Sequence, residues 1–334
     1  MRKDLKVSIF NLTRRSFLGS AAGFAVAGRK TAKAEEASTA EKNTNALNHE
    51  GSIRVRFLGS GASRWKPGWA KNPHMRRQSS ILIEGKAIID FTMCSFDKMP
   101  QDAKPEVIFQ THSHRDHYNP EAVLKSGVKR LYVHESWVAS AKMEIAEAAK
   151  TLSLNAPEVI GLTLGKSVEE CGLKFTAVPA SHSTSRITDG VLEVPVVYLI
   201  EKGASRLLYA TDTGTLPALA ARMLGIDYHI KNENYDPKNN PFFAKPQALT
   251  GIIMEATNGD TDDDFRMFVH SSVQMVSRFV NMLIKIKRFA PPPGNHVYLT
   301  HLGLKYRGWP SEKINAELPA PLKAAYDGLE ILIG

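Results

Sequence analysis

The chain is poor in cysteine, and its one candidate leader segment is short. Its 334 residues include only Cys94 and Cys171, which both lie in apolar sequence. Neither belongs to a Cys-x-x-Cys pair, so we expect two buried free thiols rather than a disulfide scaffold or a cysteine-based metal site. The apolar run from Phe17 to Ala27 is too short to span a bilayer. We therefore expect no membrane anchor in the mature protein.

The sequence also lacks a basic surface once its N-terminus is set aside. The formal net charge is +9, but the first 34 residues hold eight Lys and Arg residues against one acid, Asp4. The remainder carries 35 basic and 33 acidic side chains, a net of +2. The charge of the whole chain is therefore no argument for a polyanionic partner such as a nucleic acid.

The basic N-terminus is typical of an export signal. Arg14 and Arg15 precede the weakly apolar run, and Ala32–Ala34 supplies small residues for cleavage. The segment TRRSFL resembles the twin-arginine signal, which implies passage of the folded protein through the twin-arginine export machinery. We expect cleavage after Ala34 and a periplasmic or extracellular mature protein. The alternative is a basic surface helix. We expect residues 1–34 to be the export signal, 35–51 a polar linker and 52–334 a single domain.

Short apolar segments bounded by Gly, Pro and Asn residues predict a β-rich α+β domain. Asn119 followed by Pro120 predicts a helix start, and Gly127 predicts its end. Further helices are expected over 136–152, over 216–224 and after a capping box at 271–274. Two β-rich halves with helices outside them predict an αββα sandwich. The predicted strands lie in 53–59, 79–84, 86–90, 105–111, 128–134, 173–183, 194–201, 205–214, 250–259 and 296–303.

Residues that commonly bind metals recur where these strands end. The segment HSHRDH places three histidines and an aspartate within six residues. Buried imidazoles and carboxylates cost several kcal/mol unless they are paired or bind a metal. Imidazole and carboxylate ligands favour Zn²⁺, with Mn²⁺ or Fe as alternatives. We expect two divalent ions, held by His112, His114 and His182 on one side and by Asp116, His117 and His301 on the other, with Asp212 bridging them.

These motifs resemble those of the metallo-β-lactamase superfamily across about residues 53–306. HSHRDH, ASHS, YATDTG and YLTHLG follow the order of its metal motifs, and Asp90 in AIIDF matches its supporting carboxylate. The resemblance implies the four-layer αββα sandwich of that superfamily. FLGSGAS, MEAT and VHSS are most similar to ribonuclease Z and its phosphodiesterase relatives. That likeness implies that Glu255 orients His270 and that His270 protonates a leaving oxygen. The alternative for His270 is a plain helix cap.

The sequence also departs from these relatives. Only 29 residues separate His182 from Asp212, which leaves no room for the tRNA-grasping arm of ribonuclease Z. The structural zinc cysteines of one phosphodiesterase subgroup are absent, as is the late cysteine ligand of lactamases. We therefore expect no tRNA partner.

Two loops are candidates for substrate contact. The insertion at residues 228–247 carries Tyr235, Phe242 and Phe243, and it is either a lid over the substrate or a surface loop packed on its own aromatic rings. Arg76 and Arg77 are candidates for binding a phosphate, unless their loop is simply solvated.

The expected function is that of an exported dinuclear metal-dependent hydrolase, a phosphodiesterase acting on a small or medium organic phosphate. A metal-bridging hydroxide would attack phosphorus, Asp116 would orient it, and His270 with Glu255 would protonate the leaving group. The alternative is hydrolysis at carbon, in a lactone, thioester or β-lactam. A third possibility is a non-catalytic binding protein that carries the metals. The sequence does not predict the oligomeric state.

Overall fold

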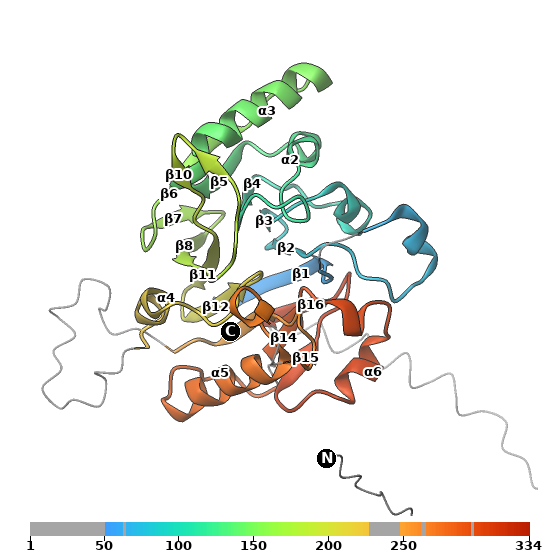
Figure 1. Ribbon diagram of the computed structural model, residues 1–334, viewed down its shortest axis with the longest axis vertical. Coiled ribbons are helices and arrows are strands. Elements are labelled where there is room, and N and C mark those ends of the chain that lie inside the picture. The colour runs from blue at the N-terminus through green and yellow to red at the C-terminus, as the bar shows by residue number, and fades with distance from the viewer. Residues whose placement is uncertain (1–50, 63–64, 227–247, 262–264, 295–296) are drawn as a thin grey trace, which may run out of the picture. The chain divides into compact units, whose positions relative to one another are not determined.

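The computed structural model describes residues 51–62, 65–226, 248–261, 265–294 and 297–334. These residues belong to one compact unit, which contains two large β-sheets (Figure 1). The predicted export signal (1–34), the linker up to residue 50 and the insertion at 228–247 lie outside the described residues. No helix within the described ranges combines the length and apolar character that a membrane span requires.

The first sheet has seven strands in the order β16-β1-β2-β3-β4-β5-β6. Strands β3 to β6 run parallel to one another, whereas β16, β1, β2 and β3 pair antiparallel. Its strands are β1 (Ile53–Gly59), β2 (Ser80–Ile83), β3 (Ala87–Ile89), β4 (Val107–Phe109), β5 (Arg130–His134), β6 (Glu158–Leu162) and β16 (Glu330–Ile333).

The second sheet also has seven strands, in the order β15-β14-β13-β12-β11-β8-β7, and β12 to β15 are parallel. A separate two-stranded hairpin, β9 (Ile187–Thr188) and β10 (Val191–Leu192), lies between β8 and β11 in the chain. The strands of the second sheet are β7 (Ser167–Glu170), β8 (Leu173–Pro179), β11 (Val196–Lys202), β12 (Ser205–Ala210), β13 (Gly251–Glu255), β14 (Val297–Thr300) and β15 (Leu322–Ala324).

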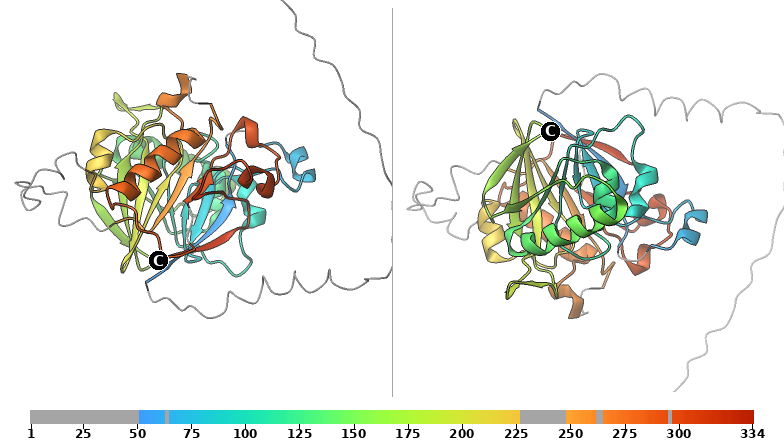
Figure 2. Two further views of the ribbon diagram at one scale, coloured as in Figure 1. Left: turned by 90° about the horizontal axis from the view of Figure 1, so that it is seen from below. Right: turned by 90° about the horizontal axis from the view of Figure 1, so that it is seen from above.

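Helices cover the outer faces of both sheets, so the predicted αββα layering is confirmed (Figures 1 and 2). Buried side chains of α2 and α3 pack on the first sheet, and those of α4, α5 and α6 pack on the second. The α-helices are α2 (Pro120–Ser126), α3 (Val138–Leu152), α4 (Ala218–Met223), α5 (Val273–Lys285) and α6 (Ser311–Asn315). Short 3₁₀ turns are η1 (Pro67–Lys71), η2 (Met93–Lys98), η3 (Glu135–Trp137), η6 (Phe265–Phe268) and η7 (Leu304–Tyr306).

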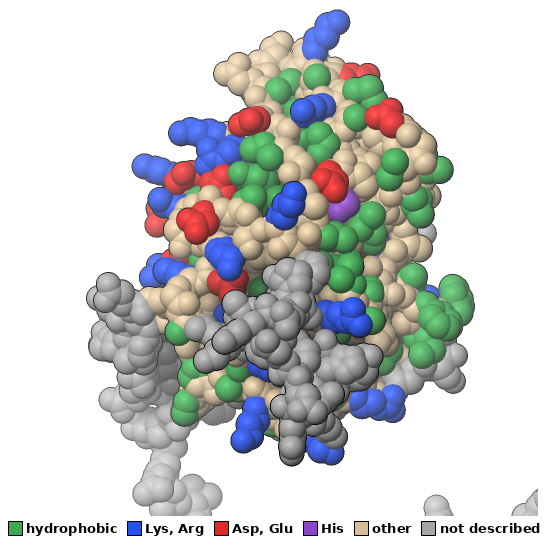
Figure 3. Space-filling model, turned by 90° about the vertical axis from the view of Figure 1, so that its left-hand side faces the viewer, with side chains coloured by type: hydrophobic (Ala, Val, Ile, Leu, Met, Phe, Trp, Pro, Cys, Tyr) green, Lys and Arg blue, Asp and Glu red, His purple; other side chains and the backbone are tan. Residues whose placement is uncertain are grey.

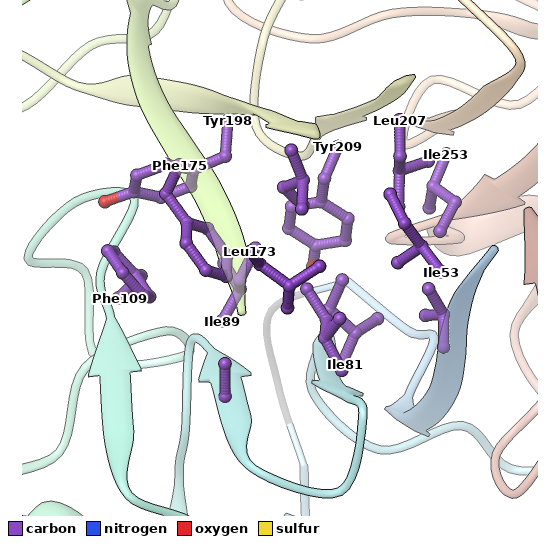
Figure 4. Close-up of a cluster of buried hydrophobic side chains, with 14 of the residues drawn as sticks. Ile53, Ile81, Ile89, Phe109, Leu173, Phe175, Tyr198, Leu207, Tyr209 and Ile253 are labelled. Atoms are coloured by element: carbon purple, nitrogen blue, oxygen red, sulfur yellow. The ribbon is translucent and has the colours of Figure 1, made fainter. Parts of the chain in front are cut away.

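The main hydrophobic core lies between the two sheets, where their inner side chains face one another (Figure 4). Phe109 of β4 stacks on Phe175 of β8 at 4.0 Å between ring centroids. Tyr198 of β11 is buried beside them, and its hydroxyl donates a hydrogen bond to the carbonyl oxygen of Gln110 at 2.6 Å. The second sheet is thus anchored to the residues that follow β4. Those residues lead into the HSHRDH segment.

Parallel pairing brings several strand ends to one edge of the sandwich. In register, Ala210 of β12 pairs with Met254 of β13, and Glu255 pairs with Thr300 of β14. Asp212, Glu255 and His301 therefore leave neighbouring strands at similar heights. Crevices at the carboxyl ends of parallel strands are where open α/β sheets commonly bind ligands.

Several local predictions need correction. Helix α5 is capped by Ser272, whose hydroxyl accepts a hydrogen bond from the Met275 amide, and not by Ser271 as the capping box predicted. The Ser271 hydroxyl donates instead to the Thr213 carbonyl, because it faces the loop after β12. Strand β8 ends at Pro179, so His182 lies on a loop. Cys94 and Cys171 are free, as predicted, but only partly buried.

Strand β16 was not predicted. It forms one edge of the first sheet, where it pairs with β1. Ile333 is fully buried in the core between the sheets, while Leu332 beside it is 45% exposed. Ile333→Ala should lower the free energy of unfolding by about 2–5 kcal/mol, because it leaves a cavity in a packed core. Leu332→Ala, the matched control, should change it by less than about 1 kcal/mol. Urea unfolding measures both, and equal effects would contradict the burial of β16.

Candidate metal centre

Seven histidine and aspartate side chains from four segments converge at this edge. They form two groups that share Asp212, and within each group the possible ligand atoms all lie within 4.8 Å of one another. The groups correspond to the sets expected from the sequence. The first group is His112, His114, His182 and Asp212, and the second is Asp116, His117, Asp212 and His301.

In the first group, ring nitrogens of two histidines point at each other. His114 Nδ1 lies 3.2 Å from His182 Nε2. His112 Nε2 lies 3.2 Å from Asp212 Oδ2, and His182 Nε2 lies 3.7 Å from the same oxygen. His182 is oriented by its other nitrogen, because Nδ1 lies 3.0 Å from the Val269 carbonyl oxygen. Its Nε2 is therefore the atom available to bind a metal ion.

The second group repeats this arrangement. His117 Nε2 lies 3.2 Å from His301 Nε2, and Asp116 Oδ2 lies 3.7 Å from both nitrogens. Asp212 Oδ2 is 2.9 Å from His117 Nε2. One carboxylate oxygen therefore contacts ligand atoms of both groups, the arrangement required of a residue that bridges two ions.

The chemistry of both groups fits divalent cations. Zn–N bonds of 2.0–2.1 Å in a tetrahedral site separate two ligand nitrogens by about 3.4 Å, close to the facing imidazole distances. His112 Nε2 and Asp212 Oδ1 are buried, and their contacts with Asp212 Oδ2 and His301 Nδ1 lack hydrogen-bond geometry. Buried polar atoms without hydrogen bonds are rare in folded proteins, and coordination of a metal ion is one way in which such atoms are satisfied. The residues present therefore fit the metals that their types predict.

Asp90 supports both groups from behind, as the resemblance implied. It is fully buried at the end of β3, and its Oδ2 lies 2.7 Å from His117 Nδ1. Its carboxylate also accepts hydrogen bonds from the Thr111 hydroxyl at 2.8 and 3.0 Å, and that hydroxyl lies 2.9 Å from His112 Nδ1. Such carboxylate partners fix the tautomer and the ring orientation of metal-binding histidines.

The backbone at the centre adopts left-handed conformations that are uncommon for residues other than glycine. Asp90, Asp212 and His301 have φ angles of 56°, 44° and 48°. Backbone strain of this kind persists where surrounding structure over-determines it, and it clusters at functional sites. Close packing adds to the constraint, because a Cβ on Gly303 would lie 2.0 Å from the Thr257 carbonyl oxygen. The glycine in YLTHLG therefore lets the Thr257 loop approach His301.

Histidines from the two groups differ in the direction in which their pKa is shifted. Burial lowers the pKa of His114 to about 4 and that of His182 to about 3, so both rings are neutral near pH 7, the form that binds metals. Burial also acts against charge on His117, but Asp212, Asp90 and Asp116 raise its pKa well above the ordinary value. These carboxylates create a negative electrostatic potential that favours a proton on the buried His117 ring. The same potential would favour a metal cation at this position.

His270 and Glu255 lie together beside the metal groups. His270 Nδ1 is 3.1 Å from Glu255 Oε1 and 3.4 Å from Asp212 Oδ1. Burial favours the neutral ring, but the Glu255 carboxylate, with Asp212 and Asp116 beyond it, raises the pKa of His270 to about 9. The cap of α5 is Ser272, so His270 is not the helix cap that was its alternative role.

Arg76 and Arg77 have contacts that leave the predicted phosphate role without support. Arg76 is 7% exposed, and its guanidinium donates to the carbonyl oxygens of Ala325, Tyr306 and Trp309. Arg77 pairs with Asp97 and Asp327. Both arginines therefore anchor the C-terminal segment. The carbonyl partners of Arg76 and the Asp327 partner of Arg77 lie 230 to 250 residues away in the chain, so the local sequence could not reveal them.

Two threonines and one backbone carbonyl that orient the ligands were not among the predicted site residues. Thr111 links Asp90 to His112, and the Thr257 hydroxyl lies 2.7 Å from His301 Nδ1. Thr111 directly precedes His112, and Thr257 lies two residues after Glu255. Their closeness to these motif residues could have identified them as residues that orient the ligands. The Val269 carbonyl that orients His182 is a backbone group and leaves no mark in the sequence.

Comparisons with known proteins agree with this geometry. A family model described as the beta-lactamase superfamily domain matches residues 92–257. A UPF0173 metal-dependent hydrolase of Methanopyrus kandleri is 27% identical over 146 residues, which are 42% of this chain and 55% of that protein. The chain spans about half the length of the curated relatives it matches.

Two solved structures share the fold. The short form of human tRNase Z superposes with a TM-score of 0.53 at 16% identity, over 84% of this chain and 99% of that one. Yeast PDE1 superposes with a TM-score of 0.52 at 9% identity, over 85% of this chain and 100% of that one. The family match places a beta-lactamase superfamily domain within residues 92–257 of this chain, and both solved structures share its fold.

Proposed function

We propose that this protein is a dinuclear metal-dependent phosphodiesterase that acts on a small or medium organic phosphate. The observation that carries the proposal is the position of Asp212 between two ligand groups, with the His270–Glu255 pair adjoining it. A hydrolase of this superfamily with a proton donor beside two cation sites is suited to in-line displacement at phosphorus. The resemblance to tRNase Z and to PDE1 is in keeping with phosphoester substrates.

The two groups would hold Zn²⁺, with Mn²⁺ or Fe as alternatives. Divalent ions at such positions supply Lewis acidity, lower the pKa of water and neutralise charge that develops on phosphate oxygens. The first group would contribute three imidazoles and the shared carboxylate. The second would contribute two imidazoles and two carboxylates. The near-complete burial of His112, His117, Asp212 and His301 would keep these ligands preorganised.

The residues at the open side of the centre would handle the protons. The side chains of Asp116 and His270 are 18% and 17% exposed, more than those of His112, His117, His182, Asp212 and His301. Asp116 would accept a hydrogen bond from the attacking water. His270 would donate a proton to the departing oxygen while Glu255 holds its ring.

The surroundings of the centre favour an organic substituent over a polynucleotide. The 3₁₀ turn η6 precedes His270 and exposes Phe265 and Phe268, which are 81% and 71% exposed. Ser181 fixes this turn beside the first group by donating a hydrogen bond to the Phe268 carbonyl at 2.8 Å. Figure 3 shows Lys and Arg side chains interspersed with Asp and Glu side chains on the face that it draws. Aromatic side chains at this position would contact an apolar leaving group.

We also propose that the protein is exported by the twin-arginine route, on the strength of Arg14 and Arg15 ahead of the weakly apolar segment. Replacing both arginines by lysine should leave the protein in the cytoplasmic fraction at its full length. The unaltered chain should appear, shortened by about 34 residues, outside the cytoplasm. Fractionation followed by mass spectrometry measures both, and unaltered export of the double variant would contradict this route.

The metal content tests the dinuclear assignment. Zinc-loaded wild-type protein should retain about two ions per chain after gel filtration. His182→Ala and His301→Ala should each retain about one, because each removes a ligand from one group only. Asp212→Ala should retain less than either, because both groups use it. Elemental analysis measures the content, with His74→Ala, an exposed histidine, as the control. A single ion in saturated wild-type protein would refute two sites.

The proposed reaction is tested by comparing substrates and by removing His270. Wild-type protein should hydrolyse bis(p-nitrophenyl) phosphate with a higher kcat/KM than any member of a lactone panel. His270→Ala should lower kcat on that diester by about 10²–10⁴-fold, the usual contribution of general acid catalysis, while zinc content stays unchanged. His74→Ala is again the control.

Other outcomes separate the alternatives. Faster turnover of lactones would favour hydrolysis at carbon. No hydrolysis of any ester by protein that contains two ions would favour a non-catalytic binding protein. Wild-type rates in His270→Ala would remove that residue from the mechanism.

A further inference from the structure

Strand β11 and the residues just before it hold the segment that carries the first two histidine ligands through hydrogen bonds to Gln110, Thr111 and Ser113. Tyr198 donates its hydroxyl hydrogen bond to the Gln110 carbonyl, and the Val196 amide donates to the Thr111 carbonyl at 2.9 Å. The third contact comes from Glu193, just before β11. It reaches Ser113, which is the residue between His112 and His114.

Glu193 makes a two-point contact with Ser113. Its Oε1 accepts a hydrogen bond from the Ser113 amide at 2.6 Å, and its Oε2 accepts one from the Ser113 hydroxyl at 2.5 Å. Glu193 is only 3% exposed, and no lysine or arginine within the described ranges forms an ion pair with it. Burial of a carboxylate is costly without compensating partners. Two hydrogen bonds from one carboxylate therefore fix both the backbone and the side chain of Ser113.

The segment that presents Glu193 is itself held in place. The Glu193 amide donates to the Arg186 carbonyl and its carbonyl accepts from the Thr184 hydroxyl, both at 3.0 Å. The Val194 amide donates to the Ser136 hydroxyl at 2.9 Å. Arg186 is anchored on helix α3 by Glu144 at 2.7 Å. Glu193 therefore acts from a braced loop, which begins just after the third histidine ligand, His182.

We propose that Glu193 is a positioning residue for the first metal group, and this rests on the proposed function in that the group must hold an ion. By fixing Ser113, Glu193 sets the separation and direction of the His112 and His114 rings. It joins their loop to the loop that follows His182, so three ligands of one ion share one brace. Among the residues that the structure describes, Glu193 forms no hydrogen bond with a residue of the second group. In that group, Asp90 orients His117 and Thr257 orients His301.

Single-group backgrounds test this selectively. His301→Ala leaves the first group intact, and His182→Ala leaves the second. Glu193→Ala should weaken zinc binding about 10–100-fold in the His301→Ala background, the usual effect of losing a partner that orients a ligand. It should leave zinc affinity unchanged in the His182→Ala background. Competition with a chromophoric chelator measures both affinities without any enzyme substrate.

Two further variants separate positioning from charge and from folding. Glu193→Gln keeps an oxygen for the Ser113 amide and offers an NH₂ group to the Ser113 oxygen, so it should restore affinity to within a few-fold of its background. Ser113→Ala removes only one of the two bonds and should weaken the first group less than Glu193→Ala does. It serves as the test if Glu193→Ala fails to fold.

The outcomes are distinct. Equal affinity of Glu193→Ala and its parent in the His301→Ala background would overturn the proposal while leaving two-ion binding intact. So would equal losses in both backgrounds, because they would indicate a general structural role. Where Glu193→Ala does not fold, unchanged affinity in Ser113→Ala would overturn it. Failure of wild-type protein to bind zinc at all would overturn the proposed function as well.

Discussion

The centre depends on one buried carboxylate, that of Asp212. Its Oδ2 lies between 2.9 and 3.7 Å from ring nitrogens of His117, His112 and His182, and its Oδ1 lies 3.0 Å from His301 Nδ1. Burial opposes its charge, yet the surrounding histidines hold its pKa well below the ordinary value. An anion that is desolvated to this degree needs positive charge close by. The rest of the fold brings the histidines, which can carry positive charge or bind a cation, to the Asp212 carboxylate.

Two further buried carboxylates extend this arrangement, one from each sheet. Asp90 at the end of β3 orients His117 directly and His112 through Thr111. Glu255 at the end of β13 accepts the Thr213 amide at 2.5 Å and the Thr257 amide at 3.1 Å. Each sheet therefore ends in a fully buried acid that ties loops together. Because the parallel strands end at one edge, the acids and the ligands they orient meet there.

The sequence could predict what depends on local pattern. HSHRDH, the strand-end residues and the Asn119 cap were recognisable because strand alternation, turn residues and ligand types are written along short segments. Contacts between distant segments left no such signal. The pairing of β16 with β1, the anchoring of the C-terminal segment by Arg76 and the grip of Glu193 on Ser113 join residues 80 or more positions apart. Their partners become apparent only once the chain has folded.

Glu255 and His270 form one motif pair but contribute at different levels. Glu255 is fully buried, and its two oxygens hold Thr213, which follows Asp212, and Thr257, which contacts His301. Its removal would therefore disturb both ligand groups as well as the proton donor. His270 is partly exposed and forms a separate candidate group with Asp212, Glu255 and His301, so its loss would remove the proposed donor and leave the two proposed metal groups complete. The frame of the centre thus rests on the glutamate, and the proposed proton transfer rests on the histidine.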